Sequence, residues 1–303
     1  MRSKFWIILA LLIFLTLGIF FLARTTSEKT KLIWEFSDEL PLYFGVVPYQ
    51  SEEIIKAELT PLMDYLTFHL KRPVKIIISQ DYNSLTHLFR TEKIHLGWFG
   101  GSYLGGASAT DFDILCGTKR NGEDRYHGAI ITRIDSGINS IFDLKGKCFA
   151  YIDKNSASGY VYPNKLFKNM GIVPKQFFGS IAFAGNQKAA ITGVLKGEFD
   201  GASIFIEKAS WSLADIASES KFQGIKALEF TDWITNGPIA VKKKMPTELR
   251  KKLFTLLTEI DKMEKGPETL EKIMKKSFSG LSGFSNMGVS IASPAEKISI
   301  NSQ

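Results

Sequence analysis

The chain has 303 residues, which is enough for one large domain or two ordinary ones. Hydrophobic residues make up 45% and charged residues 23%, so the composition is globular and excludes disordered, collagen-like and low-complexity classes. The 2 cysteines exclude a disulfide scaffold. The 4 histidines lack metal-binding spacing, so we expect no metal and no cofactor. Taken alone, the net charge of +7 would be compatible with a nucleic acid as partner.

The N-terminal segment predicts the compartment. Residues 5–23 carry no charge, and basic residues flank them on both sides. A run of this length can span a membrane as a helix, and the Leu-Ala-Arg-Thr sequence that follows is a poor cleavage site. We therefore favour an uncleaved anchor over residues 1–24, with a cleaved signal segment as the alternative, and a tether over 25–40. The N-terminus would stay in the cytoplasm and the rest would lie on the periplasmic or extracytoplasmic face.

Strands and helices alternate from residue 42 onward. Pro61 in the first helix predicts a kink, or a restart capped by Thr60. Residues 100–102 form a turn that leads toward another helix. The expected elements of this first cycle are strands at 42–47, 74–78 and 94–99, a helix capped by Ser51, and a helix at 82–90.

A second cycle of strands and helices follows. It predicts strands at 128–132, 148–152, 181–184, 199–204 and 226–230, a capped turn at 140–144, and helices at 159–170 and 188–196. Cys116 and Cys148 lie in apolar, strand-like runs. We favour two buried free thiols, and the sequence leaves a disulfide open.

The end of the chain returns to the first cycle, with a strand at 238–241 and a helix at 247–263. Apolar residues recur at helical spacing in this helix, and lysines cover its outer face. A solvated helix face explains this charge, and no basic motif is interleaved with aromatic residues, so we expect no nucleic acid.

The alternation predicts an α/β protein with two lobes, each a mostly parallel sheet flanked by helices. Polar segments at 119–125 and 235–237 indicate two crossings between the lobes. Lobe 1 would comprise residues 41–122 with 238–288, lobe 2 residues 123–237, and 289–303 would be a tail.

Several polar turns connect a strand to a helix, which places them at the carboxyl ends of strands, where open sheets bind ligands. The turn that includes Ser156, Ala157 and Ser158 follows an apolar strand and opens a helix, so its N–H groups suit an anion. Ser156 or Ser158 could instead be a simple helix cap. Three further turns contain Tyr49, Ser102 and Gln187. None of these turns contains arginine or lysine, which predicts that neutral hydrogen bonds hold the anion.

The chain resembles the phosphate, phosphite and phosphonate-binding family of ABC-transporter substrate-binding proteins, the PhnD-like family. The resemblance covers roughly residues 42–276. It rests on the order and spacing of the motifs at 44–48, 81–82, 97–100, 126, 135–138, 143–147, 155–160 and 194–200. The family implies a two-lobed periplasmic-binding fold of the second type that closes around its ligand.

The resemblance also implies roles for individual residues. The turn at 156–158 would bind phosphorus oxygens, Tyr82 and Tyr126 would line the site, and Glu207 would face a ligand amine. The family's histidine donor is replaced by Gln187. A second carboxylate is missing where Gly237 stands, so we expect that Gly237→Asp would favour amine-bearing ligands.

The sequence therefore predicts a binding protein that captures a small phosphorus oxyanion and delivers it to an ABC permease and ATPase. The alternative is a membrane-anchored sensory or accessory ectodomain of the same fold. An enzyme is disfavoured, because no histidine or lysine lies in the motif of Ser156 to act as a base.

Overall fold

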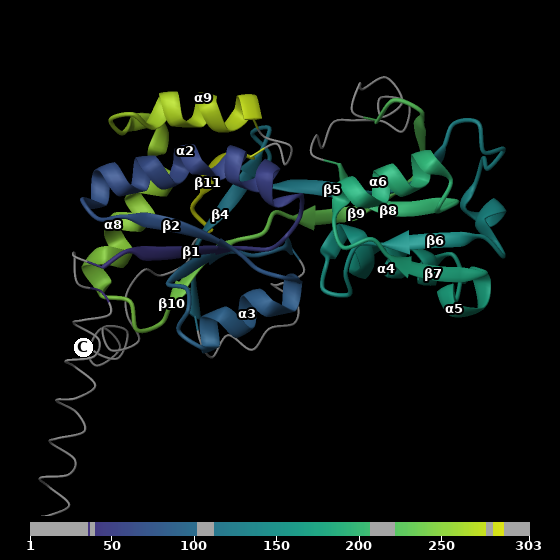
Figure 1. Cartoon of the computed structure of the whole chain (residues 1–303), viewed down its shortest axis with the longest axis horizontal. Helices are drawn as coiled ribbons and strands as arrows, with labels where there is room; N and C mark the ends of the chain where they lie inside the picture. Colours follow the sequence, from purple (N-terminus) through teal and green to yellow (C-terminus); the bar gives the residue numbers. More distant parts are fainter. Residues whose placement is uncertain (1–35, 37–39, 102–111, 207–221, 277–280, 288–303) are drawn as a thin grey trace, which may run out of the picture. The chain divides into compact units, whose positions relative to one another are not determined.

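A computed structural model describes residues 36, 40–101, 112–206, 222–276 and 281–287 of the chain (Figure 1). The predicted anchor, most of the tether, the tail and the helix expected after residue 102 lie outside these residues. Where the chain is described, no helix combines the length and apolar character needed to cross a membrane. Residues 42–303 form one compact unit, which contains two sheets.

The sheet of lobe 1 has the strand order β11-β4-β10-β3-β1-β2. Its strands are β1 (Leu42–Val46), β2 (Val74–Ile78), β3 (Leu96–Trp98), β4 (Phe112–Arg120), β10 (Ile239–Lys242) and β11 (Leu281–Ser285). Strand β1 pairs in parallel with β2 and β3, whereas β10 pairs antiparallel with β3 and β4, and β11 antiparallel with β4.

The sheet of lobe 2 has the order β7-β6-β8-β5-β9. Its strands are β5 (Arg125–Arg133), β6 (Cys148–Tyr151), β7 (Ser180–Phe183), β8 (Gly201–Ile206) and β9 (Ile225–Thr235). Strand β6 is parallel to β7 and β8, but β5 is antiparallel to β8 and β9.

Both sheets are therefore mixed, and the prediction of mostly parallel sheets is wrong. The antiparallel pairs involve β4, β5, β9 and β10, which flank the two crossings between the lobes, and also β11, which pairs with β4. An apolar run indicates that a strand is buried, but it does not indicate the direction of its neighbours.

Helices cover both sides of each sheet. In lobe 1, α2 and α9 lie on one side of the sheet and α3 on the other (Figure 1). The helices of lobe 1 are α2 (Glu52–Leu70), α3 (Tyr82–Arg90), α8 (Thr247–Thr258), η5 (Ile260–Lys262) and α9 (Gly266–Lys276). Lobe 2 has η2 (Ile141–Leu144), η3 (Ala157–Val161), α4 (Tyr162–Asn169), α5 (Pro174–Phe177) and α6 (Gln187–Lys196).

Local sequence explains where several helices begin. Asp81 accepts the Ser84 N–H at 2.7 Å at the start of α3, and Asn186 accepts the Ala189 N–H at 2.9 Å at the start of α6. Ser51 occupies the cap position of α2 without a side-chain capping bond. Helix α2 is continuous through Pro61, so the chain does not restart there.

The core of lobe 2 lies on both faces of its sheet. One cluster contains Val194 of α6 with Ile131 and Ile204 of the sheet, and the other contains Phe167 of α4 with Phe149 and Tyr151 of the sheet. A sheet buried on both faces gives near-continuous apolar strands, as β8 shows with all six of its residues buried.

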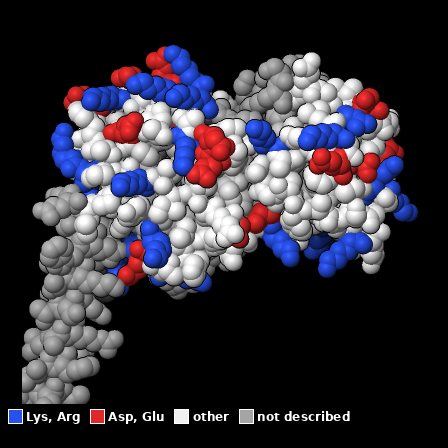
Figure 2. Space-filling model, in the orientation of Figure 1, with Lys and Arg blue, Asp and Glu red and all other residues white. Residues whose placement is uncertain are grey.

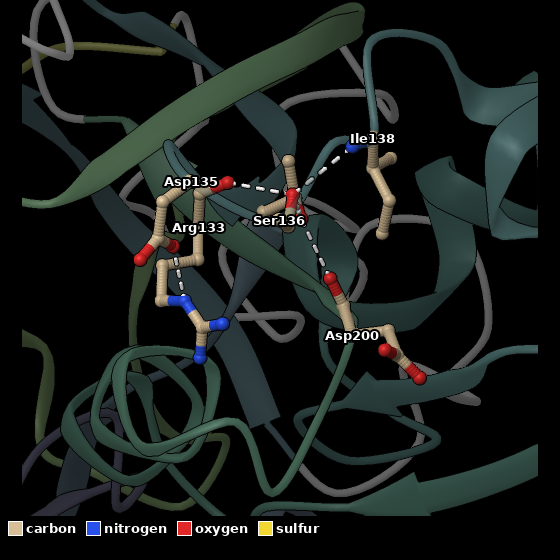
Figure 3. A network of polar contacts seen from close by, with 6 residues as sticks. Arg133, Asp135, Ser136, Ile138 and Asp200 are labelled. Atoms are coloured by element: carbon tan, nitrogen blue, oxygen red, sulfur yellow. Dashed lines mark hydrogen bonds and ion pairs between the residues drawn. The ribbon is translucent and has the colours of Figure 1, made fainter.

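Family-motif residues at 135–138 stabilise a turn at the end of β5 (Figure 3). The Ser136 hydroxyl donates to the Arg133 carbonyl at 2.7 Å, and it accepts the Ile138 N–H at 3.2 Å. Asp200 joins this network through its carbonyl, which accepts from Thr132 at 2.7 Å, while its carboxylate accepts the Cys148 N–H at 2.8 Å. These contacts give the motif a structural role at the ends of β5, β6 and β8.

The basic C-terminal helices carry ion pairs within each helix. Lys251 lies 3.3 Å from Glu248, and Lys275 lies 2.6 Å from Glu271. Figure 2 shows Lys and Arg side chains interspersed with Asp and Glu over the face that it presents. Cys116 is buried and Cys148 half-buried, and both are free thiols.

Candidate functional site

A turn at residues 156–158 forms the centre of the site, directly after strand β6. Ser156 has extended backbone angles, and its hydroxyl accepts the Gly159 N–H at 3.1 Å. The chain then makes one π-helical turn, η3, which continues into α4. The first N–H groups of a helix have no partner within it, so this turn offers donors to a ligand. The predicted helix start is confirmed, with a π-helical first turn.

Close packing fixes the position of this turn. A Cβ on Gly159 would lie 2.5 Å from Ile152, so only glycine fits there. The Ser203 hydroxyl donates to the Gly159 carbonyl at 2.8 Å from the neighbouring strand β8. Ser156, Ala157 and Ser158 are all buried. The donors are therefore held in place before a ligand arrives, which lowers the cost of binding.

Two tyrosine hydroxyls approach the turn from different parts of the chain. Tyr82, the first residue of α3, interacts through its hydroxyl with Ser156, and Tyr126 on β5 interacts with Ser158. Burial raises the pKa of both phenols, so both keep their protons and can donate. Tyr82 belongs to lobe 1 but packs against the core of lobe 2, which brings the two lobes together at this point. We call the turn and these two tyrosines the hydroxyl wall.

The opposite wall comes from the ends of strands in lobe 1. We call it the glycine wall; it consists of Trp98, Phe99, Gly100, Gly101 and Gly237. The Gly237 carbonyl accepts from the Trp98 indole at 3.1 Å and from the Thr118 hydroxyl at 2.8 Å.

Side chains are excluded from two positions of the glycine wall. A Cβ on Gly101 would lie 2.5 Å from the Thr235 carbonyl, and one on Gly237 would lie 1.7 Å from the Phe99 carbonyl. The sequence-based expectation that Gly237→Asp would add a ligand carboxylate is therefore wrong, because the first atom of any side chain there meets backbone.

A cavity of about 30 Å³ lies between the two walls. Its lining also includes Val47, Tyr49, Arg120 and Phe205. The volume is on the scale of two water molecules, so the walls enclose a small group. Among the described lining residues there is no carboxylate. The described part of the chain also has no cluster of His, Cys, Asp and Glu that could hold a metal ion.

Arg120 is a cavity-lining residue that sequence reasoning missed. It ends β4 at the first crossing, and its guanidinium carbon lies 5.5 Å from the Trp98 ring centroid, 5.2 Å from Tyr126 and 5.0 Å from Phe205. The turns themselves contain no arginine or lysine, as expected, and Arg120 joins the cavity lining from the end of β4 instead. The available signal was strand alternation: Lys119 and Arg120 lie on opposite faces of β4, and only Arg120 is buried.

Other predicted site residues differ in their positions. Ala157 and Tyr49 line the cavity, but the Tyr49 hydroxyl donates to Glu58 of α2 at 2.9 Å. The Gln187 amide is used by the backbone of Phe205: its Nε2 donates to the carbonyl at 2.8 Å, and its Oε1 accepts the N–H at 3.0 Å. Ser102 and Glu207 lie outside the described residues.

One protein family and several curated proteins are similar in sequence to this chain. The model of a family described as "ABC transporter, phosphonate, periplasmic substrate-binding protein" matches residues 44–285. A probable phosphite-binding protein of an ABC transporter from Prochlorococcus marinus is 28% identical over 179 residues, which are 56% of this chain and 59% of that protein. The phosphonates-binding periplasmic protein of Escherichia coli is 23% identical over 241 residues, 78% of this chain and 70% of that protein.

Solved structures show the same fold. The binding component of a phosphonate ABC transporter from Pseudomonas aeruginosa has a TM-score of 0.70 at 19% identity, and the similarity covers 82% of each chain. A Prochlorococcus marinus protein in complex with methylphosphonate has a TM-score of 0.67 at 19% identity, covering 86% of this chain and 96% of that one. The predicted two-lobed periplasmic-binding fold is therefore confirmed.

Proposed function

Because the chain belongs to the family of periplasmic substrate-binding proteins of phosphonate ABC transporters, we propose that it captures one small phosphorus oxyanion for import. The ligand class is phosphonate, phosphite or phosphate, and the partners are an ABC permease and its ATPase. The relatives are substrate-binding transport proteins, which confirms the expectation that the chain is not an enzyme.

The hydroxyl wall is the observation that carries this proposal. It supplies hydroxyl donors from two serines and two tyrosines, and N–H groups at a helix start. Donors of this kind match the several acceptor oxygens of a tetrahedral oxyanion. Relatives are described as binding phosphite, phosphonates and phosphate, which supports the same ligand class.

Reversible capture also fits the construction of the site. The cavity has walls from both lobes, and the Gln187 N–H donates to the Tyr49 carbonyl at 3.3 Å between them. Opening would separate Tyr82 and the glycine wall of lobe 1 from the turn and Tyr126 of lobe 2, and it would expose the turn to solvent. A ligand that touches both walls stabilises the closed arrangement by its affinity difference between the two states.

We infer the location of the protein from its family and its N-terminal sequence. The family is periplasmic, and residues 5–23 form an uncharged run long enough to span a membrane. The proposed arrangement keeps this segment in the membrane as an anchor and holds the binding lobes outside the cytoplasm. Mass spectrometry of the membrane fraction tests it: residues before Arg24 are retained if the anchor is uncleaved, and a soluble form that starts near Thr25 contradicts the anchor.

Isothermal titration calorimetry of the full-length chain tests the ligand class. The panel is phosphate, phosphite, methylphosphonate, 2-aminoethylphosphonate and sulfate. We expect binding of at least one phosphorus ligand and weaker binding of sulfate. A ligand at 100 times its Kd should also stabilise the fold by about 2.7 kcal/mol in thermal unfolding. Absence of binding and of stabilisation across the phosphorus ligands contradicts the proposed function.

A further inference from the structure

Gln187 is a buried residue at the start of α6, and it contacts one cavity-lining residue in each lobe. The residue is 2% exposed, and its amide makes two hydrogen bonds to β8: Nε2 donates to the Phe205 carbonyl at 2.8 Å, and Oε1 accepts the Phe205 N–H at 3.0 Å. The backbone N–H of Gln187 donates to the Tyr49 carbonyl of lobe 1 at 3.3 Å. Phe205 and Tyr49 both line the cavity, and Gln187 is not among the described lining residues.

The start of α6 is held in a fixed place within lobe 2. Asn186 accepts the Ala189 N–H at 2.9 Å as the helix cap, and the paired bonds of the Gln187 amide attach the first turn to β8. The first N–H groups of a helix have no acceptor within the helix, so the Gln187 N–H is available to an acceptor outside it. The side chain of Gln187 therefore determines where its own N–H lies.

The acceptor is fixed within lobe 1. Tyr49 follows strand β1, and its N–H donates to the Val47 carbonyl at 2.9 Å. The Tyr49 ring packs edge-on against Trp98 with the centroids 5.5 Å apart, and its hydroxyl donates to Glu58 at 2.9 Å. Because Tyr49 stays with lobe 1 and Gln187 with lobe 2, the bond between them exists only when the lobes are closed.

Opposite charges flank this contact. Glu53 lies in the first turn of α2, and Lys188 follows Gln187 in α6. Hydrogen bonds from its own backbone N–H and from Ser51 lower the pKa of Glu53, and the positive charge of Lys188 lowers it further. The starts of α2 and α6 therefore face each other closely enough for their charges to interact. Both side chains are exposed, so the buried backbone bond contributes more to the contact.

We propose that Gln187 is a positioning residue, which holds the lobes closed around the ligand by directing its N–H to the Tyr49 carbonyl and by fixing Phe205 at the cavity. The inference rests on the proposed function. A bond that exists only in the closed arrangement stabilises that arrangement alone. It therefore slows the release of the ligand without changing how fast the ligand enters the open site.

The first test needs no substitution. Hydrogen–deuterium exchange with residue-level mass spectrometry follows the Gln187 N–H in the full-length chain, with and without saturating methylphosphonate. We expect exchange at least tenfold slower in the bound protein, because the bond to Tyr49 protects this N–H. The control is the N–H of Lys175, an exposed residue at the start of α5, which should change less than twofold. An unchanged Gln187 N–H in the saturated protein overturns the inference.

The second test measures methylphosphonate release by stopped-flow tryptophan fluorescence in Gln187→Met, Gln187→Pro and Asn164→Leu. Methionine keeps the side-chain length and removes both amide bonds. Proline also removes the N–H, and the first position of a helix accepts it. Asn164 is the matched control outside the cavity lining. Its amide also makes two bonds within lobe 2: Nδ2 donates to the Tyr160 carbonyl at 2.7 Å, and Oδ1 accepts the Tyr151 hydroxyl at 3.1 Å.

We expect Gln187→Met to release methylphosphonate about tenfold faster than wild type, with an association rate constant within twofold. Gln187→Pro should release it at least as fast as Gln187→Met. Asn164→Leu should leave both rate constants within twofold of wild type, although it loses as many side-chain hydrogen bonds.

The possible outcomes separate this inference from the proposed function. A wild type that binds no phosphorus ligand overturns both. Binding with an unchanged release rate in Gln187→Met overturns only the inference, because the amide then does not position the contact. Equal acceleration in Asn164→Leu also overturns it, because a general loss of stability then explains the release. The exchange measurement on wild type decides the question if the Gln187 variants do not fold.

Discussion

On one side of the cavity, Trp98, Phe99 and three glycines bring backbone and rings close together; on the other, two serines and two tyrosines present hydroxyls beside a helix start. The glycine wall has no room for a side chain at Gly101 or Gly237. It contributes the shape of the cavity. In the proposed function, the hydroxyl wall contributes the groups that bind the ligand.

This difference shows how the site divides its requirements between its two walls. The shape of the glycine wall is sensitive to any added atom, because closely packed backbone cannot move aside without distorting its neighbours. Hydrogen bonding by the hydroxyl wall is sensitive to the removal of a single oxygen atom, and each such loss has a modest effect on the free energy. Substitutions in the two walls should therefore have different main effects. Those in the glycine wall should mainly lower the stability of the fold, and those in the hydroxyl wall should mainly weaken ligand binding.

The largest expected effect is on the glycine wall. Gly237→Ala would place a Cβ 1.7 Å from the Phe99 carbonyl, and backbone must move to relieve it. We expect the free energy of unfolding to fall by about 3 kcal/mol or more, measured by urea denaturation. Gly100→Ala is the matched control, because its Cβ would first meet the Tyr82 ring at an ordinary 3.4 Å. Equal stability of the two variants would contradict rigid shape as the role of this wall.

A slightly smaller effect concerns pH and the strand that leads into the glycine wall. His95 directly precedes β3, and its Nδ1 accepts the Tyr43 N–H at 2.9 Å, so this nitrogen must be unprotonated. Burial lowers the pKa of His95 to about 4, and the charges of Lys242 and Arg72 add to the effect. An unfolded histidine titrates near 6.5, so between these values the unfolded state binds more protons.

The folded state should therefore lose stability as pH falls from 6.5 to 4, by about 3 kcal/mol in total. Urea unfolding of wild type and His95→Asn at several pH values measures this loss; asparagine can accept the same N–H but does not titrate. We expect a shallower slope for the variant. Parallel slopes would show that His95 binds protons equally in the folded and unfolded states, which contradicts a pKa lowered by folding.

The sequence predicted the parts of this comparison that depend on local order. Alternating apolar and polar segments placed most strands and helices, and the small residues at 156–158 after a buried strand identified the helix start. Cap residues such as Asp81 and Asn186 bond to backbone within three residues of their own position, so the sequence alone can predict their effect.

Features that depend on contacts between residues far apart in the chain could not be predicted from the sequence. Strand β11 and helix α9 were not predicted, and the direction of β4 and β10 in the sheet followed only from their neighbours. The cation of Arg120 meets rings from residues 98, 126 and 205, which no spacing in the chain brings together. Gln187 was expected to donate to a ligand, and its amide instead binds the Phe205 backbone.

The smallest expected effects concern the hydroxyl wall and separate its two serines. Ser156→Ala removes the oxygen that caps Gly159 and interacts with Tyr82, so it should cost about 1 kcal/mol of stability. Ser158→Ala removes the interaction with Tyr126 and no cap, so its cost in stability should be less than half of that. Both variants should weaken methylphosphonate binding about tenfold, or about 1.4 kcal/mol, because each loses one hydroxyl donor to a charged group.

Thermal unfolding and calorimetry on the same samples distinguish the two contributions, with exposed Ser180→Ala as the control that should change neither. If the Ser156→Ala protein is less stable but binds methylphosphonate as tightly as wild type does, Ser156 is only a helix cap. A Ser158→Ala protein with unchanged affinity would move the ligand away from the turn. Loss of affinity in both, with loss of stability concentrated in Ser156→Ala, is the result expected of a wall whose rigid turn both supports the fold and presents its donors to the ligand.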